Sequence, residues 1–117
     1  MESEEYILYQ EGRNAMEKGD FATAAEMLKR SAETTPHFKT YECIGECLLE
    51  EGKFREAVFY LSAAAGLGNK SFRSYYFLAK ALLELGNLEL AKIKLNQALS
   101  IKPDYRSAKD LLNKISD

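Results

Sequence analysis

Hydrophobic side chains along the chain recur every three or four residues in seven segments, which is the spacing of one face of an α-helix. Six of these segments form three pairs. A glycine and a polar residue separate the members of each pair, at Gly19-Asp20, Gly52-Lys53 and Gly86-Asn87. Glycine readily adopts the left-handed conformation that ends a helix, and Asp or Asn accepts a backbone N–H bond where the next helix begins. The pattern therefore predicts three helical hairpins, with a weaker cap at Lys53.

The expected first helices of the three hairpins span residues 3–18, 38–51 and 71–85, and the expected second helices span 21–34, 54–65 and 88–101. After Pro103 and Asp104 a seventh segment, 105–116, has an apolar stripe at helical spacing. The stripe consists of Tyr105, Ala108, Leu111, Leu112 and Ile115. We expect this segment to be a capping helix that covers the last hairpin and completes the C-terminal end of the array.

The three hairpins are also three copies of one sequence pattern, offset by 33 and then 34 residues. The glycines that end the first helices coincide under this shift. So do several bulky and small positions, among them Leu8, Tyr41 and Tyr75; Gly12, Gly45 and Ala79; Ala24, Ala57 and Ala91; Leu28, Leu61 and Leu95; and Pro36, Asn69 and Pro103. Recurrence at a fixed period of this length is the signature of a repeat architecture in which neighbouring units bury each other's apolar faces.

Small and bulky residues at these offsets, with a closing proline, resemble the pattern of tetratricopeptide repeat proteins. The resemblance covers about residues 5 to 105, although Leu8, Tyr41 and Tyr75 occupy a position where the family often has Trp, and Asn69 replaces one proline. It implies an all-α, right-handed α-solenoid of seven helices in a single domain, 1–117. The expected repeats are about 5–37, 38–71 and 72–105, followed by the capping helix at 105–116.

Two local features refine this expectation. The small residues Gly12, Gly45 and Ala79 are expected to face Ala24, Ala57 and Ala91, so that the paired helices approach closely and a large side chain would push a hairpin open. In the middle repeat, Gly66 and Gly68 replace the proline turn, and we expect a looser junction there.

Composition and charge favour a globular protein. Apolar residues make up 46% of the 117 residues and charged residues 29%. The longest uncharged stretch, 57–69, is shorter than the roughly 20 residues that a membrane-spanning helix needs, and the acidic first residues do not resemble a secretory leader. We therefore expect a cytoplasmic protein with no membrane contact. The net charge of −2 argues against a general nucleic-acid binder, which usually carries a basic patch.

The resemblance implies a binding surface, because in this family the first helices line a concave groove that holds an extended peptide or a partner helix. Residues of the first helices outside the packing stripe are the candidates for this groove. They are Tyr6, Tyr9, Arg13, Lys39, Glu42, Cys43, Glu46, Arg73, Tyr76, Phe77 and Lys80, with Met16, Leu49 and Leu83 towards the helix ends. Tyrosine and arginine are enriched where binding energy concentrates. For any one of these residues, the alternative is ordinary solvated surface.

Chaperone-binding members of the family hold a C-terminal carboxylate with five groove residues: Lys, Asn, Asn, Lys and Arg. The resemblance places Tyr9, Arg13, Cys43, Arg73 and Phe77 at these positions. Only Arg73 keeps the family's charge at its position. We therefore do not expect binding of the acidic C-terminal tails of Hsp70 or Hsp90.

The sequence contains no constellation that predicts catalysis, a metal site or a cofactor. The only histidine, His37, lies in a predicted turn without an adjacent nucleophile. Cys43 and Cys47 are one helical turn apart, which gives a Cβ separation of about 5 to 6 Å, too long for a disulfide, and two cysteines do not complete a zinc site. Buried packing is the simpler role for both.

The leading hypothesis is therefore a non-enzymatic protein-interaction adaptor whose groove takes a peptide or a partner helix. A second hypothesis is self-assembly through exposed residues of the first helix, such as Tyr6 and Ile7. A third is binding of single-stranded nucleic acid, with tyrosines stacking on bases and the groove cations on phosphates. The intervening Glu42 and Glu46 and the negative net charge disfavour the third.

Overall fold

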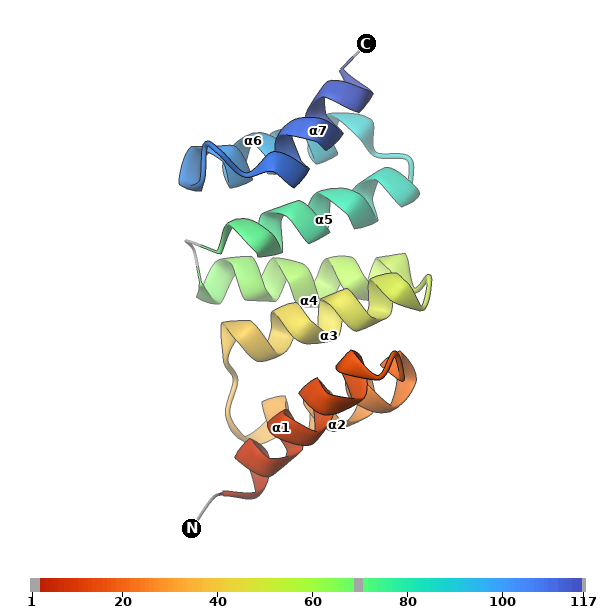
Figure 1. Cartoon of the computed structure of the whole chain (residues 1–117), viewed down its shortest axis with the longest axis vertical. Coiled ribbons are helices and arrows are strands. Elements are labelled where there is room, and N and C mark those ends of the chain that lie inside the picture. Colours follow the sequence, from red (N-terminus) through yellow and green to blue (C-terminus); the bar gives the residue numbers. More distant parts are fainter. Residues whose placement is uncertain (1–2, 69–70, 117) are drawn as a thin grey trace.

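The computed structural model describes residues 3–68 and 71–116, which form seven helices and, within those ranges, no strand (Figure 1). The helices are α1 (Glu4–Glu17), α2 (Phe21–Thr34), α3 (Phe38–Glu50), α4 (Phe54–Leu67), α5 (Phe72–Glu84), α6 (Leu88–Ile101) and α7 (Arg106–Ile115). The predicted all-α class is confirmed, and most helix ends lie within one residue of the prediction. The helices stack in chain order into an elongated array of 51 × 25 × 21 Å, with the termini at opposite ends.

The turns inside the hairpins have the expected chemistry. Gly19, Gly52 and Gly86 adopt φ angles of +80°, +76° and +82°, which side-chain-bearing residues rarely adopt. The Asp20 and Asn87 side chains each accept a 3.3 Å hydrogen bond from the backbone N–H of the third residue of the next helix, Thr23 and Leu90. The Lys53 side chain makes no capping hydrogen bond, which confirms the weaker cap of the middle hairpin.

The junction after the middle hairpin differs from the expectation. Helix α4 continues to Leu67, so that Gly66 lies inside the helix and Gly68 is the residue that caps it. A Cβ atom on Gly68 would overlap the ring of Phe38, and a glycine is therefore required there for close packing. Gly68 thus packs closely against Phe38, and the looser junction stays a prediction. Asn69 lies outside the described residues.

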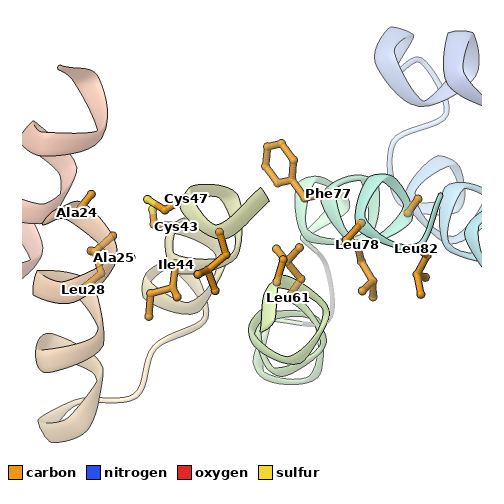
Figure 2. Packing of buried hydrophobic residues seen from close by; sticks show 14 of the residues in the cluster. Ala24, Ala25, Leu28, Cys43, Ile44, Cys47, Leu61, Phe77, Leu78 and Leu82 are labelled. Atoms are coloured by element: carbon orange, nitrogen blue, oxygen red, sulfur yellow. The ribbon is translucent and has the colours of Figure 1, made fainter. Parts of the chain in front are cut away.

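The core consists of the apolar positions that repeat in the sequence. Leu28, Leu61 and Leu95 occupy the same position in the three second helices, and all are fully buried (Figure 2 shows the first two). The close approach is present in the first two hairpins, where a leucine lies nearest to the glycine; at Gly12 the expected Ala24 also lies near, with its backbone oxygen 3.4 Å from the position of a Cβ. A Cβ on Gly12 would lie 2.7 Å from Cγ of Leu28, and a Cβ on Gly45 would overlap Leu61. The small residue of the first helix thus accommodates the leucine of the second helix.

The two ends of the array are closed differently. At the C-terminal end, α7 buries Ala108 completely and packs Leu111, Leu112 and Ile115 against the core, as predicted for a capping helix. At the N-terminal end, the outer face of α1 carries polar residues. Glu11 takes the repeat position that Ile44 and Leu78 fill with buried side chains, and Asn14 takes that of Cys47 and Ala81. Terminal repeats of such arrays need a polar outer face.

Candidate functional site

The first helices of the three hairpins, α1, α3 and α5, lie side by side along the array and form one continuous face. A cavity of about 620 Å³ opens on this face. It is lined by Arg13, Met16, Glu17, Phe21, Lys39, Glu42, Cys43, Glu46 and Arg73. We call it the central cavity. Six of the eleven residues predicted for the groove therefore come together around one hollow, from all three first helices.

A second cavity, of about 410 Å³, lies near the start of α1. It is lined by Ser3, Glu5, Tyr6, Tyr9, Ser31, Thr35, His37, Lys39 and Thr40. This α1–α3 pocket holds the two predicted tyrosines, and it adjoins the central cavity because Lys39 lines both. Sequence reasoning missed the contribution of α2 and of the loop after it, because nothing in the repeat pattern places Ser31 or Thr35 next to α1.

The remaining predicted residues, Tyr76, Phe77 and Lys80, lie on α5 and line neither cavity. The Tyr76 ring packs edge-on against Tyr105, with the ring centres 5.4 Å apart. Phe77 is 9% exposed and belongs to the core (Figure 2). The aromatic end of the predicted groove is therefore mostly a packing cluster, with Lys80 as its exposed member.

Three of the groove cations lie over aromatic rings of their own helices. The Arg13 guanidinium lies 5.8 Å from the centre of the Tyr9 ring and donates a 3.0 Å hydrogen bond to the Tyr9 hydroxyl. Arg73 lies 5.3 Å from the Phe77 ring, and Lys80 lies 5.4 Å from the Tyr76 ring. The hydrogen bond that Arg13 donates to Tyr9 is the main reason that the pKa of Arg13 is raised. These contacts hold the charges in place before any partner binds.

Glu42 was predicted to be an anion available in the groove, but its carboxylate is engaged by other residues. Only 8% of Glu42 is exposed, and its Oε1 accepts hydrogen bonds of 2.6 Å from the hydroxyls of both Ser71 and Ser74. Its Oε2 lies 3.9 Å from Nε of Arg73. The carboxylate thus links α3 to the start of α5, and it orients Arg73 towards the central cavity.

Replacing Glu42 with alanine should therefore destabilise the array by about 1 to 3 kcal/mol, because the buried Ser74 hydroxyl loses its carboxylate acceptor. Glutamine at the same position keeps an oxygen at Oε1, so Glu42→Gln should lose less than half as much. Urea unfolding followed by circular dichroism measures both. Equal losses in the two variants would mean that the hydroxyl bonds do not carry the stabilisation.

Glu46 lies between the cations of the central cavity and is only partly exposed. Burial raises the pKa of its carboxyl group, an effect that nearby Arg73 opposes and that Glu42 reinforces. The charged form of Glu46 is therefore less favourable in the folded protein than in the unfolded chain.

The sign of this shift predicts a pH-dependent gain for Glu46→Gln. With the folded-state pKa above the unfolded one, the Glu46 carboxyl destabilises the fold increasingly as the pH rises through its folded pKa. The variant should match the parent's free energy of unfolding below the ordinary carboxyl pKa of about 4.3, and exceed it modestly at pH 7. Thermal unfolding of both proteins at pH 3.5 and pH 7 makes the comparison. A variant that is less stable at pH 7 would contradict the assignment.

The two cysteines behave as buried neutral groups. Both are free and buried, and burial raises the pKa of Cys43 to about 11 and that of Cys47 to about 12. Cys43 therefore presents an uncharged thiol in the central cavity. His37 caps α3, since its Nδ1 accepts a hydrogen bond from the backbone N–H of Lys39. Among residues 3–68 and 71–116 no group of three or more His, Cys, Asp or Glu side chains could hold a metal ion.

A stack of antiparallel hairpins with its first helices on one continuous face defines the helical repeat class, and sequence comparison identifies which one. Two family models described as tetratricopeptide repeat match residues 48–115 and residues 9–67. The chain belongs to the tetratricopeptide repeat family. In the described part of the chain, no helix has the length and apolar character needed to cross a membrane.

Among curated proteins, the chain is 28% identical over 94 residues to the human DnaJ homolog subfamily C member 3. The match covers 80% of this chain and 19% of that protein. It is 23% identical over 105 residues to TPR repeat-containing protein MJ1428 of Methanocaldococcus jannaschii, covering 89% of this chain and 18% of that protein. The chain thus spans about a fifth of the length of the curated relatives that it matches.

Solved structures share the fold at low sequence identity. The first TPR of Spaghetti (RPAP3), bound to the HSP90 peptide SRMEEVD, superposes with a TM-score of 0.93 at 21% identity and covers 97% of this chain and 90% of that one. The type III secretion chaperone SycD of Yersinia enterocolitica, in complex with a peptide of the translocator YopD, gives 0.83 at 21% identity, with coverages of 95% and 86%. At 21% identity, the similarity to these two structures shows a shared fold alone.

Proposed function

We propose that this chain is a non-enzymatic protein-interaction adaptor that binds an extended peptide or a partner helix on the face of α1, α3 and α5. The central cavity is the observation that supports this most directly, since it gathers side chains of all three first helices around about 620 Å³. The neighbours in complex with HSP90 and YopD peptides have the same fold, and they support a peptide or protein as the partner. A cytoplasmic location belongs to the same proposal.

Charge reversal at two exposed groove cations tests the proposal. Wild type and the double variant Lys39→Glu with Arg73→Glu are used as baits in a lysate, and bound proteins are quantified by mass spectrometry. A matched control reverses Arg30 and Arg55 to glutamate, which are exposed on the second helices α2 and α4 and do not line the central cavity. We expect the groove variant to lose at least one partner about tenfold while the control retains it. Identical partner lists for all three baits would contradict the proposal.

The Hsp70 and Hsp90 tails remain outside the proposed partner range. The carboxylate-holding positions of the family carry Tyr9 and Cys43 here, and a third carries Phe77, which has no polar group to donate to a carboxylate and is packed into the core. Titration of the peptide SRMEEVD into the chain measures this directly. A dissociation constant near 1 μM, equivalent to about −8 kcal/mol, would overturn the expectation.

Self-assembly through the terminal helices is the second candidate. Tyr6 and Ile7 on α1 are 44% and 41% exposed, which favours it. Glu11 and Asn14 oppose it, because they place polar groups where another unit would have to pack. Light scattering at high micromolar concentration tests for self-assembly, and a strictly monomeric chain would exclude this second candidate.

A further inference from the structure

Each of the three first helices ends on a glutamate. Glu17 is the last residue of α1, Glu50 of α3 and Glu84 of α5, and all three are exposed. They occupy the same position in the repeat, 33 and then 34 residues apart. None of the three helices has a basic residue in its last turn. A helix C-terminus is the negative end of the helix dipole, so a carboxylate is unfavourable there. The same unfavourable charge at three neighbouring ends indicates a role in binding.

An apolar strip runs beside this acidic row. Met16, Leu49 and Leu83 directly precede the three glutamates, and each is partly buried against the core. Met16 and Glu17 line the same cavity as Lys39 and Arg73, which lie near the N-terminal ends of α3 and α5. The face thus has an acidic edge, an apolar strip beside it, then Arg13, Glu46 and Lys80 one helical turn from the edge, and finally the exposed cations Lys39 and Arg73.

The dimensions of this face fit a helix. Lys39 and Glu50 are eleven residues apart on α3, as are Arg73 and Glu84 on α5, which corresponds to about 16 Å along a helix. An α-helix with its side chains is roughly 10 to 12 Å wide, so a helix lying across the first helices fits between the glutamates and Lys39 and Arg73. Arg13, Glu46 and Lys80 share a repeat position four residues, about 6 Å, before the glutamates, so such a helix lies partly over them. Three basic and three acidic residues line the central cavity, so their charges sum to zero. The arrangement of these charges is therefore what can select a partner.

We infer that the groove binds an amphipathic helix with segregated charged flanks, lying across α1, α3 and α5. Its apolar stripe packs on Met16, Leu49 and Leu83. One flank, rich in Lys or Arg, faces the glutamates that end the first helices. The other, rich in Asp or Glu, faces Arg13 and Lys80 one turn from those glutamates, with Glu46 between these two cations, and Lys39 and Arg73 further on. This inference rests on the proposed function and narrows its partner to one class. Because aromatic rings already hold three of the cations, little ordering is required on binding.

Two synthetic helices of identical composition test the inference. Each has 18 residues and a leucine stripe at helical spacing. One carries all its lysines on one flank and all its glutamates on the other, and the second has both charges mixed on both flanks. Fluorescence anisotropy with the full chain should show the segregated helix binding at least tenfold more tightly. Equal affinities would overturn the inference and leave the proposed adaptor function standing. Failure of both helices to bind would also overturn it, whatever the lysate experiment shows.

Charge reversal on the chain supplies the matched control. The triple variant Glu17→Lys, Glu50→Lys, Glu84→Lys should bind the segregated helix at least tenfold more weakly. Its unfolding temperature should not fall, because lysine is favourable at a helix C-terminus. The control triple Glu26→Lys, Glu56→Lys, Glu89→Lys makes the same change in net charge at exposed positions of the second helices, and its affinity should stay within twofold of the wild type. Equal losses in both triples would mean that only net charge matters, and would overturn the inference.

Discussion

Replacing Gly45 with leucine should leave the chain largely unfolded at 25 °C. A Cβ atom at this position would already overlap Cγ and Cδ2 of Leu61, which is fully buried in α4. Overpacking by single methylene groups typically costs about 1 to 3 kcal/mol, and leucine adds four carbons where there is no room for one. Single domains are stable by only about 5 to 15 kcal/mol in total, so the loss removes most of the folding free energy. Urea titration followed by circular dichroism at 222 nm measures the loss of folding free energy.

The smaller change Gly45→Ala should cost about 1 to 3 kcal/mol, and a second glycine provides its control. Gly66 lies inside α4 on the exposed surface, and a Cβ there would meet nothing within 4 Å. Gly66→Ala should therefore stabilise the chain by roughly 0.5 to 1 kcal/mol through lower backbone entropy in the unfolded state. The same substitution thus has opposite signs at two helical glycines. Equal stabilities for both variants would contradict the packing described here.

A double variant separates overlap from other causes. Leu61→Ala alone should cost about 2 to 5 kcal/mol through the cavity that it leaves. Combined with Gly45→Ala, the total should be clearly less than the sum, because the new methyl group occupies part of the vacated space. Strict additivity would mean that the two positions are not in contact.

The repeat period made most of the fold predictable. Gly19, Gly52 and Gly86 recur because each hairpin contains the same turn. Their left-handed conformation follows from local chemistry alone. The partner of a small residue was not predictable in the same way. A Cβ on Gly12 would meet Leu28 more closely than the expected Ala24, which lies one helical turn before it. The repeat period determines which residues are equivalent. Which residues face each other depends on how the two helices are rotated about their axes, and the packing of whole side chains sets that rotation.

The location of the candidate surface could be predicted from the sequence. Which of its charged side chains are available to a partner was harder to predict. The first helices do bring Arg13, Lys39 and Arg73 to one cavity. Whether a charge is available to a partner depends on neighbours that are distant in sequence. Glu42 is engaged because Ser71 and Ser74, 29 and 32 residues later, point their hydroxyls at its carboxylate. That contact requires the start of α5 to lie beside the first half of α3, which residue types alone do not specify.

Replacing Ala108 with arginine should detach the capping helix. Ala108 is fully buried in α7 and occupies the repeat position of Thr40 and Ser74, both also buried. An unpaired charge at such a site costs roughly 3 to 5 kcal/mol if the helix stays docked. The helix can instead undock, so the measured loss cannot exceed the free energy with which α7 binds the array. Asp110→Arg introduces the same side chain two residues away on the exposed face of α7, and should change stability by less than about 0.5 kcal/mol.

Hydrogen exchange followed by mass spectrometry should show where the loss occurs. In Ala108→Arg, amides of α7 should exchange freely and those of α5 and α6 should lose part of their protection, because the last hairpin loses the neighbour that covers it. Helices α1 and α2 have no substantial packing against α7 or the last hairpin, and their amides should keep most of their protection. Full protection of α7 in the arginine variant would contradict a buried Ala108. A uniform loss over all seven helices would instead mean that the array unfolds as one unit, with the capping helix holding every hairpin and not only the last.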